Sequence, residues 1–167
     1  MKKSNLTITL TLALLTTVFI FGCAGKKDKD RNFDADLGFR TIVLRVNTAD
    51  LPPGNKDTEE YCSFPGQPSD VPDSLFTTNV SLGDTILWVG VSTSPPYDDD
   101  VSILRIKHHG KDNILNEPVI HGKNGAVIGF IENDGEVEKY SIQFRVTKAG
   151  VPGSHVYNID PKLRIIN

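Results

Sequence analysis

Apolar and polar residues alternate along much of the chain after residue 38, with the period of two that is typical of β-strands. The clearest case is the segment 138–147, in which Tyr140, Ile142, Phe144 and Val146 alternate with polar or charged residues. This segment is therefore predicted to be a strand with one face in the core and the other in water.

Two other segments are apolar on both faces. Phe39–Val46 has apolar residues at both odd and even positions, which predicts a strand paired within a sheet. Residues 85–91, Thr-Ile-Leu-Trp-Val-Gly-Val, predict the central strand of the domain, with Trp88 as its largest core residue.

Shorter segments between turn residues predict the remaining strands, at 76–80, 101–108, 118–121, 126–131, 155–159 and 163–166. The sequence Asn133-Asp134-Gly135 is a strong hairpin signal, and the proline at 118 predicts an edge strand. No segment has helical spacing. About nine short strands predict an all-β domain, an antiparallel β-sandwich of the immunoglobulin-like or cupredoxin-like kind.

Two long connections are rich in Pro, Gly, Asp and Ser, and they cover residues 47–75 and 92–100. Loops on a rigid scaffold commonly carry binding residues, so both are predicted contact surfaces. Tyr97, beside Pro95 and Pro96, is the first candidate contact residue.

The N-terminus has the layout of a secretory signal. Lys2 and Lys3 precede an uncharged, largely apolar run at 6–21, and Cys23 follows. As a helix this run would be about 24 Å long, shorter than the bilayer core of about 30 Å, which favours a signal peptide over a permanent membrane span.

Ile20-Phe21-Gly22-Cys23 resembles the bacterial lipobox, although a small residue is more usual at the position of Phe21. The resemblance implies that residues 1–22 are a lipoprotein signal peptide and that Cys23 carries the acyl chains. It also implies a tether at 23–37, one domain at 38–167, and a place in the cell envelope, in the outer membrane. An ordinary signal peptide or an uncleaved anchor is the alternative.

The net charge of the chain limits the classes of partner that we expect. Without residues 1–22 the chain has 16 basic and 21 acidic side chains, a net charge of −5, and it has no basic cluster. Nucleic acid is therefore not expected as a partner, and membrane attachment would depend on the lipid.

With Cys23 lipidated, Cys62 has no cysteine left to pair with. It lies between aromatic residues at 61 and 64, which predicts burial, and no histidine near it in sequence would activate it. A redox protein or enzyme that uses Cys62 is the least favoured alternative.

Metal ligands are few. Gly83-Asp84-Thr85-Ile86-Leu87-Trp88 resembles one strand of the cupredoxins, but a blue-copper site also needs histidines, a cysteine and usually a methionine, and the single methionine is Met1. His108 and His109 would point to opposite faces of a strand, whereas His108 and His121 are a candidate pair across neighbouring strands.

Calcium is the one candidate cofactor. Asp98, Asp99 and Asp100 share one loop, and a second acidic loop covers residues 132–136. Hard cations favour clustered carboxylates, so a calcium-dependent binding module is an alternative, with solvated acidic turns as the simpler interpretation.

Catalytic motifs do not occur in this chain. It has no nucleophile elbow, no Gly-rich phosphate loop and no His-Glu-x-x-His sequence, so an enzyme is not predicted.

Asp73-Ser74-Leu75 and Asp84-Thr85-Ile86 resemble the O-glycosylation sequon of Bacteroidetes-type bacteria, which implies Ser74 and, less so, Thr85 as candidate sites. Residues 83–88, 139–144 and 157–162 make the chain similar to uncharacterised small secreted all-β proteins of such bacteria. The predicted function is a membrane-anchored lipoprotein with a non-enzymatic binding or structural module, whose partner is an envelope protein or a glycan.

Overall fold

The computed structural model describes residues 38–54, 57–111 and 113–166, all within one compact unit. These residues form ten strands and a single turn of 3-10 helix. The elements are β1 (Phe39–Val46), η1 (Glu59–Tyr61), β2 (Cys62–Ser63), β3 (Thr77–Val80), β4 (Thr85–Ser92), β5 (Asp100–His108), β6 (Val119–His121), β7 (Val127–Phe130), β8 (Val137–Thr147), β9 (His155–Ile159) and β10 (Lys162–Ile165).

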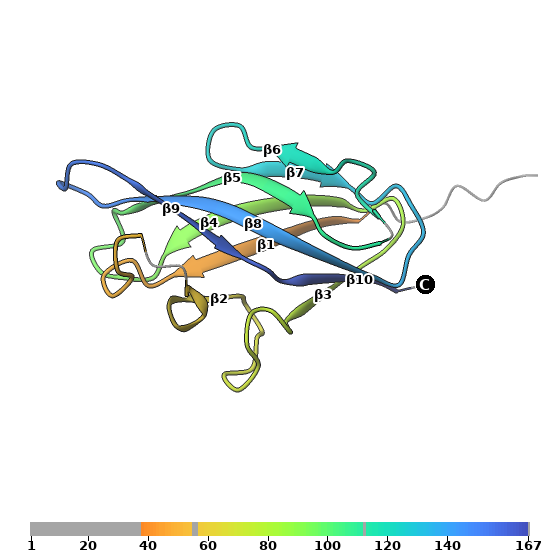
Figure 1. Cartoon of the computed structure of the whole chain (residues 1–167), viewed down its shortest axis with the longest axis horizontal. Coiled ribbons are helices and arrows are strands. Elements are labelled where there is room, and N and C mark those ends of the chain that lie inside the picture. Colours follow the sequence, from red (N-terminus) through yellow and green to blue (C-terminus); the bar gives the residue numbers. More distant parts are fainter. Residues whose placement is uncertain (1–37, 55–56, 112, 167) are drawn as a thin grey trace, which may run out of the picture. The chain divides into compact units, whose positions relative to one another are not determined.

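The strands form two sheets (Figure 1). The first sheet has the order β2-β1-β4-β7, and the second has the order β3-β10-β8-β5-β6. The long strand β8 pairs with β10 near its start and with β9 over its second half, because Asp160 and Pro161 interrupt the last part of the chain.

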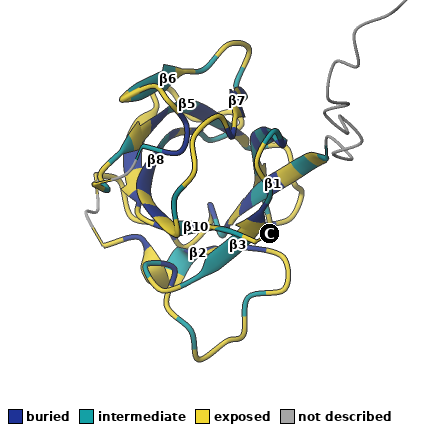
Figure 2. Cartoon of the chain, turned by 90° about the vertical axis from the view of Figure 1, so that its right-hand side faces the viewer, coloured by how far each residue is buried: buried dark blue, intermediate teal, exposed yellow. Residues whose placement is uncertain are grey.

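The core lies between the two sheets (Figure 2). Trp88 of β4 and Tyr140 of β8 are both fully buried, and their rings meet edge to face at 6.0 Å. The Trp88 Nε1–H donates a hydrogen bond of 3.3 Å to the Tyr140 hydroxyl, so the buried indole N–H has an acceptor inside the core.

The all-β class is confirmed, and so is the place of Trp88 in the core. The sheets are mixed rather than antiparallel, because β1 runs parallel to β4 and β10 runs parallel to β3. The domain is therefore a loose sandwich of two mixed sheets. Strand β2 was not predicted; it is only two residues long, too short for a periodic pattern.

The hairpin predicted at residues 133–135 is wrong. Strand β7 pairs with β4 in the first sheet, whereas β8 pairs with strands of the second, so residues 131–136 cross from one sheet to the other. The motif does lie between two strands, but a local motif does not decide whether the flanking strands pair with each other.

A buried carboxylate holds the start of β1 beside the start of β4. Asp84 is 1% exposed, and it accepts hydrogen bonds from the Gly38 backbone N–H at 3.1 Å and the Ser81 backbone N–H at 2.8 Å. The Arg40 guanidinium donates a third at 2.5 Å. Burial alone would raise the pKa of Asp84, but the hydrogen bonds from Arg40 and from the two amides lower it below its usual value.

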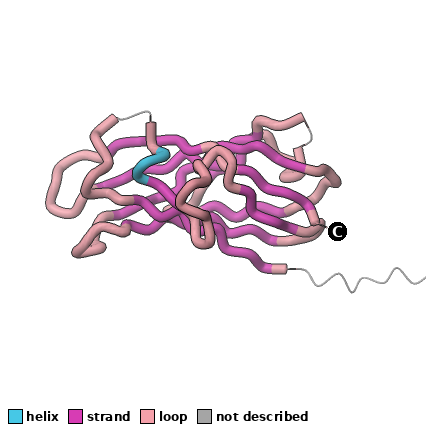
Figure 3. Tube along the Cα trace, turned by 90° about the horizontal axis from the view of Figure 1, so that it is seen from below, coloured by secondary structure: helices cyan, strands magenta, loops and turns pink. Residues whose placement is uncertain are grey.

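Where the structure describes it, the long connection at 47–75 is mostly loop with the single turn of helix η1 (Figure 3), and some of its side chains reach the core. Leu51, Cys62 and Phe64 are buried, and the Phe64 ring stacks on that of Phe76 at 5.1 Å. Apolar side chains therefore anchor this connection even though it has little regular structure.

Candidate functional site

Three loops meet at one end of the sheets, at residues 47–54, 92–99 and 148–154, which we call the loop cluster (Figure 1). They follow β1, β4 and β8, which all end there. The described domain begins at the opposite end, because β1 starts at Phe39 and runs toward the loop cluster.

Hydrogen bonds hold two of these loops together. The Ser94 hydroxyl donates to Asn47 Oδ1 at 2.8 Å and accepts from the Ala49 backbone N–H at 2.9 Å. Thr48, fully buried, shares a hydrogen bond of 2.7 Å with the hydroxyl of Ser92. Because these side chains are buried or half-buried, their hydrogen bonds fix the positions of both loops.

The third loop is attached through Asp99 and Lys148. The Ala149 backbone N–H donates to Asp99 Oδ1 at 2.8 Å, and Lys148 Nζ donates to the Ala49 carbonyl at 3.3 Å. Hydrogen bonds from Thr48 and from the Ala149 amide lower the pKa of Asp99, which therefore stays ionised at neutral pH.

Tyr97 protrudes from this fixed framework. It is 66% exposed and has a φ of 70°, in the left-handed region that non-glycine residues seldom adopt. Its backbone N–H donates to the Ser94 carbonyl at 2.8 Å, so a tight turn presents the ring to solvent. A strained residue with an exposed aromatic side chain is typical of binding surfaces.

A hollow of about 310 Å³ lies beside the loop cluster. It is lined mainly by apolar groups, among them Pro53, Val151, Pro152 and Tyr157, with Lys148 and His155 as its basic members. The Tyr157 hydroxyl donates to the Pro52 carbonyl at 3.2 Å, and its ring stacks on Phe144 of the core. One wall of the hollow is therefore rigid.

The three candidate calcium ligands do not act as one group. Asp98 and Asp100 are exposed, Asp99 is bonded to Ala149, and Asp100 Oδ2 accepts a hydrogen bond from the Ser102 hydroxyl at 2.5 Å. In the part of the chain that the structure describes, no three His, Cys, Asp or Glu side chains are placed to hold a metal ion together. Calcium binding at this loop stays a prediction.

Cys62 is buried, as predicted, and burial together with the nearby Asp73 carboxylate raises the pKa of its thiol to about 12. The thiol is therefore protonated at neutral pH, and a thiolate is the form that attacks or binds metal. This environment does not favour the alternative of a redox protein or enzyme that uses Cys62.

Asp73 lies beside it, in the wall of a hollow of about 450 Å³ formed wholly by residues 59–73. The carboxylate is 1% exposed; its Oδ1 accepts a hydrogen bond of 2.7 Å from Gln67, and its Oδ2 has no hydrogen-bond partner. Burial raises the pKa of Asp73 to about 6. Its charge therefore changes in the range just below neutral pH.

The two candidate glycosylation sites differ in their surroundings. Ser74 is half-buried at the rim of another hollow, and Leu75 beside it is 58% exposed. Thr85 is the first residue of β4 and is half-buried between β1 and β7. In both sequons the aspartate is buried, at Asp73 and Asp84, so only part of each motif lies at the surface.

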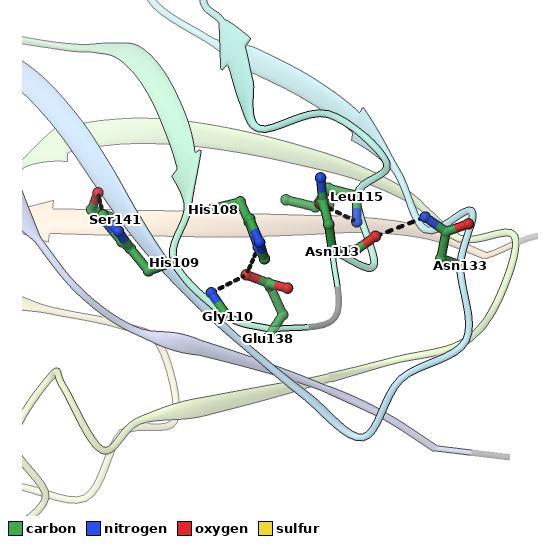
Figure 4. Close-up of polar contacts among 8 residues, drawn as sticks. All are labelled: His108, His109, Gly110, Asn113, Leu115, Asn133, Glu138 and Ser141. Atoms are coloured by element: carbon green, nitrogen blue, oxygen red, sulfur yellow. Dashed lines mark hydrogen bonds and ion pairs between the residues drawn. The ribbon is translucent and has the colours of Figure 1, made fainter.

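A buried His–Glu pair was not predicted from the sequence (Figure 4). Glu138 is fully buried, and its Oε1 contacts His108 Nδ1 and accepts a weaker hydrogen bond of 3.4 Å from the Gly110 backbone N–H. A buried carboxylate destabilises a fold unless it is paired, so His108 is a structural partner of Glu138. The period-two pattern was a usable signal, because it places Glu138 on the same face as Tyr140.

The neighbouring histidine makes a separate contact: His109 Nε2 and the Ser141 hydroxyl lie 2.7 Å apart. Because Ser141 and Glu138 contact different histidines, the four residues do not form a Ser–His–acid relay. The predicted pairing of His108 with His121 is wrong, since His121 lies opposite Arg105 in the β5–β6 ladder.

Cys23 and the predicted signal peptide and tether, residues 1–37, lie outside the described residues. Among the described residues, no helix has the length and apolar character needed to cross a membrane.

Comparison with known proteins supports the fold of this chain and nothing more. No protein-family model matches this chain, and no curated protein matches it. The chain is similar in structure to the inclusion body protein PixA from Burkholderia cenocepacia, with a TM-score of 0.55 over 81% of this chain and 99% of that one. The two sequences are 12% identical, so this likeness supports the all-β architecture and carries no functional residue.

Proposed function

We propose that this chain is a lipid-anchored protein of the bacterial cell envelope whose domain is a non-enzymatic binding module. The loop cluster is its contact surface, and its partner is a protein or a glycan of the envelope. The observation that carries the proposal is the exposed Tyr97 on a framework of loops that partly buried hydrogen bonds hold in place.

The anchor is proposed at Cys23, with outer-membrane attachment through its acyl chains. The direction of β1 supports this arrangement, because the described domain begins at the end opposite the loop cluster. A lipid joined through residues 23–37 would therefore leave the contact surface free. The mass of the intact protein, extracted from its own membranes, tests the anchor. We expect a chain that starts at Cys23 and carries acyl mass, whereas an unlipidated chain with another start would refute it.

The chemistry of the loop cluster suits a broad partner surface better than a small polar substrate. Aromatic and proline side chains are rigid and lose little entropy when they are covered, and tyrosine is enriched at protein interfaces. Tyr97 and the adjoining hollow with Pro53, Val151 and Pro152 supply such groups. Lys148 and His155 add polar contacts at the margin of the hollow.

A photo-crosslinking amino acid at position 97 of the full chain would identify the partner in intact cells. Affinity for that purified partner is then measured for the wild type, for Tyr97→Ala and for the control Leu82→Ala. Leu82 is 46% exposed, outside the loop cluster. We expect Tyr97→Ala to weaken binding at least tenfold, about 1.4 kcal/mol, as for a central aromatic contact. Equal affinity of all three proteins would refute this contact surface.

A further inference from the structure

Two adjoining hollows of the domain are rich in carboxylates. The larger, of about 450 Å³, is formed by residues 59–73, and the smaller, of about 370 Å³, lies against residues 158–160. Glu59 lines both, so the two hollows are neighbours. Among the described residues in their walls there is no lysine, arginine or histidine, whereas six are acidic: Asp57, Glu59, Glu60, Asp70, Asp73 and Asp160.

The four carboxylates of the larger hollow are not neutralised by the rest of the described domain. None of them forms an ion pair with another described residue. Arg45 lies opposite Ser63 of the wall in the β1–β2 ladder, and it too forms no ion pair with them. Negative charges gathered in one hollow focus the field there, so this place attracts a cation from solution.

Asp73 distinguishes this hollow from a solvated acidic surface. It is 1% exposed, its Oδ1 accepts the hydrogen bond from Gln67, and its Oδ2 has no hydrogen-bond partner. Gln67 also donates to the Val71 carbonyl at 2.7 Å and accepts from the Phe64 backbone N–H at 2.8 Å, so the residue that holds Asp73 is itself fixed. A buried carboxylate is seldom left unpaired, and this one lies in the wall of the hollow. A cation in the hollow would supply the missing partner.

The geometry of the larger hollow suits an ammonium group better than a metal ion or a guanidinium. A metal ion draws several oxygen ligands to about 2.0–2.6 Å, and no three described His, Cys, Asp or Glu side chains are placed to do this. A guanidinium binds a carboxylate best through two parallel hydrogen bonds, but Gln67 already occupies Oδ1 of Asp73. An ammonium is compact, and its three N–H donors can turn toward separate carboxylates.

We propose that the larger hollow binds a primary ammonium group, carried by a lysine side chain of a partner or by a free polyamine, with Asp73 as its buried counter-charge. The exposed Glu59, Glu60 and Asp70 attract the cation. Asp73 acts through its charge, because a cation within about 4–6 Å favours the ionised form of a carboxylate. The site shares no residue with the loop cluster or with the proposed anchor, so it stands or falls independently of the proposed function.

Binding at this site should be linked to the protonation of Asp73. The titratable groups around Asp73 are the Cys62 thiol, which is protonated at neutral pH, and the carboxyl groups of Glu59, Glu60 and Asp70. Burial raises the pKa of Asp73 to about 6, so its charge is present at pH 7.5 and largely lost at pH 5. The affinity for an ammonium group should therefore fall over this range as the pH is lowered.

Calorimetric titration of the purified full chain in a neutral detergent tests the site, with spermidine and an end-blocked tri-lysine peptide as probes. The test variant is Asp73→Asn, which keeps an acceptor for the Gln67 hydrogen bond. The matched control is Asp134→Asn, which removes the same charge from an exposed aspartate outside both hollows. Urea unfolding of each variant checks that a loss of binding is not a loss of folding.

We expect saturable binding at pH 7.5 that Asp73→Asn weakens at least tenfold and Asp134→Asn less than about twofold. At pH 5 the affinity of the wild type should approach that of Asp73→Asn. Tighter binding of the peptide would identify a lysine side chain as the source of the ammonium group, and equal or tighter binding of spermidine would identify a free polyamine. Equal weakening by the two variants would show diffuse attraction to an acidic surface and overturn the site. So would the absence of saturable binding for both probes, or an unchanged affinity of Asp73→Asn.

Discussion

Replacing Asp73 with Asn should stabilise the domain at neutral pH, although the change removes a native charge. Asp73 is 1% exposed and its Oδ2 has no partner, so its ionised form is poorly solvated in the folded state. Asparagine keeps an oxygen that can accept the 2.7 Å hydrogen bond from Gln67 Nε2. The substitution therefore removes the buried charge and keeps the contact that holds the side chain.

The magnitude follows from proton linkage. Burial raises the pKa of Asp73 from 3.8 to about 6 in the folded state, a difference of about two units, and one unit corresponds to about 1.4 kcal/mol. The folded state binds this proton more tightly than the unfolded state. The stability that the protonated Asp73 carboxyl contributes is thus fully present below about pH 4 and is lost as the pH rises through about 6. At pH 7.5 the ionised carboxylate should cost about 3 kcal/mol, which Asp73→Asn recovers.

Urea unfolding of the wild type, of Asp73→Asn and of the control Asp70→Asn from pH 4 to pH 8 measures this directly. The free energies of unfolding of wild type and Asp73→Asn should nearly coincide at pH 4 and diverge by about 3 kcal/mol by pH 7.5. Asp70 is exposed in the same loop, and its variant should follow the wild type. Parallel curves for wild type and Asp73→Asn would show that Asp73 does not carry an unfavourable charge.

Three further predictions concern other groups. Asp84→Asn should destabilise the domain at pH 7 by about 3 kcal/mol, because a charged acceptor of three hydrogen bonds is lost. Since the pKa of Asp84 is lowered in the folded state, the difference in stability from the wild type should shrink as the pH falls below about 4. A difference in urea unfolding that stays constant with pH would contradict this. Cys62, buried and with a pKa of about 12, should react with iodoacetamide at pH 8 only after unfolding, and modification of the native protein detected by mass spectrometry would count against its burial. Millimolar calcium should leave the melting temperature unchanged, because Asp99 and Asp100 are hydrogen-bonded to Ala149 and Ser102 rather than turned toward a common point. A rise of the melting temperature that Asp98→Asn abolishes would instead establish the calcium-dependent module.

The strands themselves could be predicted because their signals are local. β1 has the bounds expected from its pattern, and β8 differs from the prediction by one residue. Alternation along β8 identified a buried face, and that face includes Glu138. The chemical meaning of Glu138 could not be predicted in the same way, because its partner His108 lies 30 residues away on another strand.

The candidate site was predictable only in part. The composition of the loops at 47–75 and 92–100 indicated contact surfaces, and Tyr97 is exposed as a contact residue must be. The third loop, at 148–154, was not indicated as a contact surface by the sequence. It belongs to the loop cluster through hydrogen bonds from Lys148 and Ala149, which depend on long-range chain folding.

By itself, then, the sequence determined the all-β class, the approximate strand positions and the burial of Trp88 and Cys62, since period-two patterning and turn residues act over a few positions. Only the tertiary structure decided that β1 and β4 run parallel, that residues 131–136 cross between sheets, and that His108 pairs with Glu138. It also decided which apolar face of β4 the core would cover. Leu87 and Trp88 are both apolar in the sequence, but a sheet can pack only one of its faces against the other sheet, so Trp88 is fully buried and Leu87 is half-buried.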